Sequence, residues 1–121
     1  MERLFAAFGR RDGAAVAAMF EPDIVWRVGG GTPMSGEHRG WRDVVAFLRR
    51  TTQETEGTYR SSLVWAAGDD AHAAAVYRAR GRRNGRELDI EQLLLCDLRD
   101  GRIATATAVP FDADAFTRFW S

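Results

Sequence analysis

Apolar residues in the first part of the chain recur at the 3.6-residue spacing of amphipathic helices. Two such groups lie within residues 4–8 and 16–20. Asp12 stands between them, where its carboxylate can cap the second helix. Pro22 is expected to end that helix, because proline disfavours helical geometry in the preceding residue. The pattern therefore predicts two helices followed by a strand over about 23–28.

The rest of the chain predicts one more helix, a sheet and a terminal helix. A glycine-rich loop over 29–40 precedes a helical pattern that begins at Trp41 and closes near Thr51 or Thr52. Period-2 alternation then predicts strands over about 58–66, 72–82, 87–98 and 102–109. Asp112 opens a short terminal helix. Without a repeat or linker, residues 1–121 are expected to form one α+β domain with a meandering antiparallel sheet.

The dipeptide Asn84-Gly85 predicts a two-residue hairpin turn, which sets the register of its two strands. Tyr77 then lies opposite Gln92. The same register produces three cross-strand pairs of opposite charge: Arg82–Glu87, Arg80–Asp89 and Arg78–Glu91. Such pairs specify the register more than they stabilise the sheet.

Asp100-Gly101 predicts the next turn and divides the sheet into two faces. One face carries Tyr77, Ile90, Gln92, Leu94, Cys96, Thr105, Thr107 and Val109. The other carries Val76, Leu93, Leu95, Ala106 and Ala108 beside a charged end. The first face is expected to lie under the helices. The second predicts a homodimer interface, because an exposed apolar patch usually marks one; the alternative is that the terminal segment folds back over it.

Composition restricts the function classes. Seventeen basic and seventeen acidic residues balance, so neither nucleic acid nor a membrane is expected as partner. The chain has no lysine, which excludes Schiff-base chemistry. No apolar run approaches the ~20 residues of a membrane span, and a cytoplasmic protein is expected. The single Cys96 is expected to be a buried, inert thiol rather than a nucleophile, and no metal or cofactor is expected.

Four segments carry a family resemblance: FAAFGRRD, FEPDIVWRV, SGEHRGWRDVVAFL and LLLCDLRDGRI. In this order and spacing, they make essentially the whole chain resemble the SnoaL-like group of the nuclear transport factor 2 (NTF2-like) superfamily. The resemblance implies a cystatin-like α+β barrel: a cone of helices and curved, antiparallel or mixed sheet, open at one end around a small-molecule pocket. Members are commonly homodimers packed through the sheet. They include polyketide cyclases, ketosteroid isomerases, epoxide hydrolases, dehydratases and non-catalytic binders, so the fold alone does not define the activity.

The resemblance also shows what this chain lacks. Ketosteroid isomerases carry a tyrosine and two carboxylic acids at the positions that match Leu4, Val28 and Leu94 here, and all three are apolar. The remaining acids of the sheet are expected to point outward. Acid–base chemistry would therefore rest on His38, in the glycine-rich loop, and on Tyr77. Alternatively, His38 is a solvated loop residue, and Tyr77 and Gln92 simply satisfy one another.

The hypothesis from the sequence is a binding protein for a hydrophobic, ring-containing metabolite with a carbonyl or hydroxyl group. The alternative is a cofactor-independent cyclase, isomerase or dehydratase that uses His38, Tyr77 and Gln92. A third possibility is that aromatic side chains fill the cavity. The residues expected around the ligand are Trp26, Val28, His38, Phe47, Tyr77, Gln92, Leu94, Thr105, Thr107, Val109 and Phe116.

Overall fold

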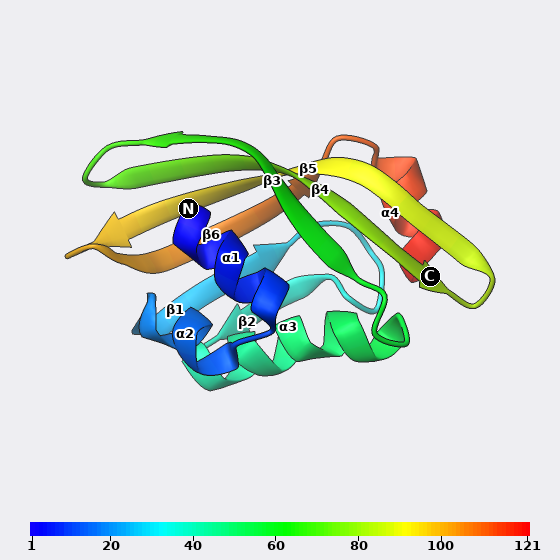
Figure 1. Cartoon of the computed structure of the whole chain (residues 1–121), viewed down its shortest axis with the longest axis horizontal. Helices are drawn as coiled ribbons and strands as arrows, with labels where there is room; N and C mark the ends of the chain where they lie inside the picture. Colours follow the sequence, from blue (N-terminus) through cyan, green and yellow to red (C-terminus); the bar gives the residue numbers. More distant parts are fainter.

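A curved six-stranded sheet packs against helices in the computed structural model, which describes all 121 residues (Figure 1). The elements in chain order are α1 (Glu2–Arg10), α2 (Gly13–Ala18), β1 (Phe20–Val28), β2 (Gly36–Arg39), α3 (Trp41–Glu54), β3 (Arg60–Gly68), β4 (His72–Arg83), β5 (Arg86–Arg99), β6 (Arg102–Pro110) and α4 (Ala113–Trp120). The predicted α+β class and the order of the four helices are confirmed.

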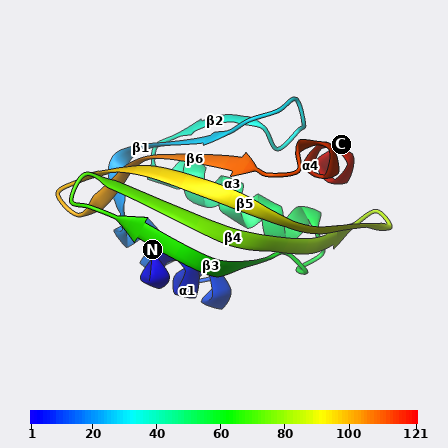
Figure 2. The same ribbon diagram turned by 90° about the horizontal axis from the view of Figure 1, so that it is seen from above.

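The sheet has the strand order β2-β1-β6-β5-β4-β3, and Figure 2 shows α1 and α3 on one side of it. Neighbouring strands are antiparallel except β1 and β6, which run parallel, so the sheet is mixed. β2 lies in the segment predicted to be a glycine-rich loop. It pairs with β1, with His38 opposite Trp26.

Asp12 makes the sharp corner between α1 and α2. α1 ends at Arg10, and the next residue, Arg11, has a left-handed backbone with φ of 55°. The Asp12 carboxylate then accepts a hydrogen bond from the Ala15 amide at 3.0 Å and so satisfies an amide of the first turn of α2. This confirms the predicted cap. Asp112 caps α4 in the same way.

The boundary between α2 and β1 differs from the prediction. α2 ends at Ala18, and Phe20 already belongs to β1. Pro22 therefore lies inside a strand instead of ending a helix. The pairing of β1 with β6 is irregular between Phe20 and Val25. Such a bulge tolerates a residue without an amide hydrogen.

The β4–β5 hairpin has the predicted register, with Tyr77 opposite Gln92. Asn84 and Gly85 have φ of 51° and 74°, as the tight turn requires. The ion pairs differ in detail. Asp89 accepts hydrogen bonds from Arg80 at 3.1 Å and from Arg78 at 2.6 Å, so Arg78 reaches across to Asp89 and not to Glu91. Arg82 and Glu87 lie opposite each other without forming an ion pair.

A bulge overturns the predicted register of β5 and β6. Leu98 pairs with Ile103 as expected, but Asp97 pairs with Thr105, which leaves Ala104 as an extra residue. One inserted residue moves every later side chain to the other face. Thr105, Thr107 and Val109 therefore lie on the outer face, and Ala106 and Ala108 on the inner one. Thr105 donates a hydrogen bond there to Asp97 at 2.6 Å.

The core lies between the helices and the inner face of the sheet. Ala106 is fully buried there beside Trp26, its register partner on β1, where a small side chain leaves space for the indole. The outer face keeps several exposed apolar side chains: Trp65, Leu95 and Val109. None of the four helices is long and apolar enough to cross a membrane.

Candidate functional site

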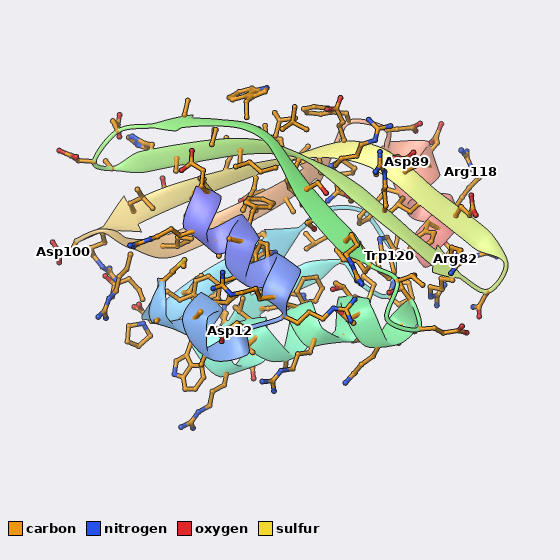
Figure 3. All side chains as sticks on the ribbon, viewed as in Figure 1. Asp12, Arg82, Asp89, Asp100, Arg118 and Trp120 are labelled. Carbon is orange, nitrogen blue, oxygen red and sulfur yellow. The ribbon has the colours of Figure 1, made fainter.

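A cavity of about 330 Å³ lies between α1, α3 and the inner face of the sheet. This volume is at the lower end of the ~300–1,000 Å³ typical of small-molecule sites. Aromatic side chains line the cavity without filling it, which answers the question that the sequence left open. Asp12 and Trp120 both contribute to the lining, and Figure 3 shows Asp12 low in the molecule beside α2, with Trp120 to its right.

The deep wall of the cavity is apolar. The strands contribute Trp26, Val28, Leu94 and Ala108, and α4 contributes Phe116 and Trp120. All six are buried. The two α4 side chains reach the cavity because the Asp112 cap starts the helix directly after the end of β6. A ligand there would be surrounded mostly by hydrocarbon.

Tyr77 and Gln92 are the polar groups of this wall. They face each other across β4 and β5, and both are at least 94% buried. Gln92 Nε2 donates a hydrogen bond to the Tyr77 hydroxyl at 2.6 Å. Gln92 Oε1 has no partner. An unpartnered buried acceptor costs about 1–3 kcal/mol, so this atom is a natural place for a hydrogen bond from a ligand or a water.

The pair leaves a free polar atom in either orientation of the amide. With Nε2 donating to Tyr77, Oε1 is a free acceptor, and the Tyr77 hydroxyl hydrogen must also find an acceptor. With the amide turned over, Tyr77 donates to Oε1, and the NH₂ group becomes a free donor. The alternative from the sequence was that Tyr77 and Gln92 satisfy each other's hydrogen-bonding groups. Their mutual hydrogen bond leaves at least one of these groups without a partner. A carbonyl or hydroxyl group on a ligand would supply that partner.

Burial keeps the tyrosines of the cavity neutral. It is the main cause that raises the pKa of Tyr77 well above its usual range, and the nearby Tyr59 adds to the effect. The pKa of Tyr59 is raised by the same burial. Both hydroxyl groups are therefore hydrogen-bonding groups at neutral pH and poor bases.

His38 is not part of the cavity lining. It lies on β2 with its ring stacked on Phe47, at a centroid distance of 4.1 Å and an interplanar angle of 23°. Burial and then the charge of Arg50 lower the pKa of His38, against the effect of Asp43. The Nε2 atom is buried without a partner. His38 therefore supports Phe47, a wall residue, from behind.

Carboxylates are nearly absent from the cavity. Asp12 is the one acidic residue in the lining, and its carboxylate is engaged as the cap of α2. Asp89, Glu91 and Asp97 lie on the outer face of β5, as expected. Cys96 is buried, and this burial raises its thiol pKa to about 12, as an inert thiol requires. The site is therefore well suited to binding through hydrogen bonds and apolar contacts, and poorly suited to proton transfer.

The structure brings together seven of the side chains expected around a ligand: Trp26, Val28, Phe47, Tyr77, Gln92, Leu94 and Phe116. Their role in binding stays a prediction. His38 lies behind the wall, and the β6 bulge explains why placing Thr105, Thr107 and Val109 in the pocket was wrong. The same bulge removes Ala106 and Ala108 from the expected dimer interface. Val76, Leu93 and Leu95 do lie on the outer face.

Several lining residues have no counterpart in the sequence prediction. They include Tyr59 and three arginines, Arg11, Arg49 and Arg60. Arg11 follows a helix and Arg49 is a charged, exposed residue of one, and such residues ordinarily indicate solvated surface. The helical spacing of Arg49 relative to Val45 and Leu48 was the only available signal.

Comparisons with known proteins agree with this architecture. A profile of the SnoaL-like domain matches residues 1–106. The uncharacterised protein Rv0034 of Mycobacterium tuberculosis is 34% identical over 122 residues, which cover 100% of this chain and 93% of that protein. Bal32a, from a soil-derived mobile gene cassette, has a solved structure with a TM-score of 0.95 and 26% identity, covering 99% of this chain and 92% of Bal32a.

A third similar structure is a protein of Xanthomonas campestris proposed to be a polyketide cyclase. It has a TM-score of 0.77 and 21% identity, and the match covers 99% of this chain and 93% of that one. At that identity, the likeness concerns the fold alone. Other solved structures of this fold are NTF2-like proteins. The profile match, which spans most of the chain, shows that the chain belongs to the SnoaL-like family.

Proposed function

We propose that the protein binds a small, hydrophobic, ring-containing metabolite in its cavity, with a ligand carbonyl or hydroxyl group at the Tyr77–Gln92 pair. The observation that carries the proposal is the unpartnered Gln92 Oε1 in the wall of an open, mostly apolar cavity. An apolar site with a few fixed polar groups is typical of small-molecule recognition. The ring would pack against Trp26, Leu94 and Phe116.

Calorimetric titration with naphthalene-2-carboxamide tests this proposal, because the probe is neutral and carries one ring system and one carbonyl group. We expect binding with a Kd on the order of 1 mM or tighter. Gln92→Leu removes the free amide and should weaken binding about 5- to 30-fold. Val28→Phe, which fills part of the cavity, should abolish binding while circular dichroism shows a folded protein. Equal binding by wild type and both variants would refute the proposal.

The second candidate function is a cofactor-independent cyclase, isomerase or dehydratase using His38, Tyr77 and Gln92. It is favoured by the fold shared with the Xanthomonas protein. It is disfavoured by the position of His38 behind Phe47 and by the raised pKa of Tyr77. A pH–rate profile altered by His38→Ala or Tyr77→Phe would support catalysis. Unchanged turnover in both variants would show that neither residue is catalytic and would leave the binding proposal standing.

The outer sheet face supports a homodimer as part of the same proposal. Val76, Leu93 and Leu95 lie there on adjacent strands, with Trp65 and Val109 beside them. Leu95 and Trp65 are 47% and 53% exposed in the single chain. A second copy would cover this apolar surface, and α4 does not, because its side chains Phe116 and Trp120 face the cavity.

A further inference from the structure

The mouth of the cavity is marked by those lining residues that are exposed to solvent. They are Gly9, Arg11, Arg49, Gln53 and Arg60. They come from the end of α1, the second half of α3 and the start of β3, three elements that lie near one another in Figure 1. Three of the five are arginines, and none is acidic.

The three arginines line the same opening, and together they are called the arginine cluster. Arg11 Nη2 donates a hydrogen bond to the Gly57 carbonyl at 2.5 Å, and Arg60 Nη1 donates to the same oxygen at 3.1 Å. Arg49 reaches from α3 to the α1–α2 corner, where its Nη2 would lie 3.0 Å from a methyl group on Gly13. Three guanidinium groups on separate elements thus gather at one opening.

This positive charge is not neutralised within the protein. None of the three arginines forms an ion pair. Asp12, the one carboxylate of the lining, is held by the Ala15 amide. The net charge of the whole chain is zero, so the cluster is a local excess. A cleft with one sign of charge and low-dielectric walls concentrates the opposite charge.

We propose that the arginine cluster binds a carboxylate on the ligand, so that the protein selects anionic ring-containing molecules. The inference rests on the proposed binding function and adds a second recognition point to it. Guanidinium groups hold a carboxylate through paired, charge-assisted hydrogen bonds. The ligand would place its rings in the apolar wall, its carbonyl or hydroxyl group at Gln92, and its carboxylate at Arg49 and Arg60.

The test compares naphthalene-2-carboxylate with naphthalene-2-carboxamide by calorimetry, because the two probes share their shape and differ in charge. The carboxylate should bind about tenfold more tightly to the wild type. That preference should shrink as salt is added, whereas carboxamide binding should stay unchanged. Arg49→Gln is the main variant, because Arg49 makes no hydrogen bond or ion pair whose loss would disturb the fold.

We expect Arg49→Gln to weaken carboxylate binding about threefold or more, and Arg49→Gln/Arg60→Gln to remove the preference. Arg42→Gln is the matched control: it removes the same charge from the same helix at a position outside the cavity. Equal affinity of the wild type for both probes would overturn the carboxylate inference and leave the binding proposal intact. An equal loss of carboxylate affinity in Arg42→Gln and in Arg49→Gln would also overturn the carboxylate inference. If neither probe binds, both proposals fail.

Discussion

Gln92 donates a 2.6 Å hydrogen bond to Tyr77 across the β4–β5 pair, yet the other polar atom of its amide has no partner. This incomplete polar pair lies in the wall of an otherwise apolar cavity. The two residues hold each other in place, so the free atom has a defined position before any ligand arrives. Such preorganisation reduces the entropy lost on binding.

The Tyr77–Gln92 pair should also contribute measurably to the stability of the protein. Tyr77→Phe leaves the whole Gln92 amide unpartnered and should lower the free energy of unfolding by about 1–3 kcal/mol, measured by urea denaturation. The double variant Tyr77→Phe/Gln92→Leu replaces both partners by apolar groups and should recover most of that loss. A double variant less stable than Tyr77→Phe would contradict this account of the pair.

The β6 bulge makes a prediction about neighbouring residues. Ala106 is fully buried on the inner face, and Thr107 lies on the outer face. Ala106→Leu should destabilise the protein by about 1–3 kcal/mol through overpacking. Thr107→Leu should change stability by about 0.5 kcal/mol or less. The register without a bulge requires a larger loss of stability in Thr107→Leu than in Ala106→Leu. That result would show that Ala104 is not the extra residue.

The proposed dimer can be tested by introducing one charged side chain into the outer face of the sheet. The wild type is expected to sediment as a dimer at micromolar concentration, and Leu95→Glu should convert it to a monomer, because a buried unpaired carboxylate is costly. Trp41→Glu is the control, since Trp41 is 39% exposed on α3, away from the outer face of the sheet. A monomeric wild type would contradict the dimer.

His38 should make stability depend on pH. Burial lowers its pKa below the ordinary 6.5, so the folded state favours the neutral ring. The free energy of unfolding therefore carries the full contribution of the neutral His38 above pH 6.5. This contribution is lost as the pH falls from 6.5 through the pKa of the folded state, because the unfolded chain takes up the proton first. Urea unfolding should show a smaller loss toward low pH in His38→Leu than in His72→Leu. An NMR titration that places the folded His38 pKa above 6.5 would contradict this sign.

The sequence predicts best where a turn defines its own geometry. Asn84-Gly85 accepts two positive φ angles, which few other dipeptides do, so the β4–β5 register and the Tyr77–Gln92 pair could be predicted. The turn at Asp100-Gly101 was equally clear. The bulge three residues later has no local signature, because Ala104 resembles its neighbours, and every face assignment beyond it was reversed.

Other errors have similar causes. Phe20 continues the helical spacing of α2 and equally begins the alternation of β1, so spacing alone could not place the boundary. β2 is short and follows glycines, and it forms because β1 offers it an edge. The arginine cluster depends on the approach of α1, α3 and β3, which no local pattern describes.

The central claim is that a ring-containing ligand binds inside the cavity, and the four tryptophans test it directly. Trp26 and Trp120 line the cavity, whereas Trp41 and Trp65 are exposed outside it. In ¹⁵N-edited NMR spectra recorded during titration with naphthalene-2-carboxamide, the indole signals of Trp26 and Trp120 should move together, and those of Trp41 and Trp65 should stay in place. Movement confined to Trp41 or Trp65, or no movement of any indole signal at a saturating probe concentration, would contradict the claim.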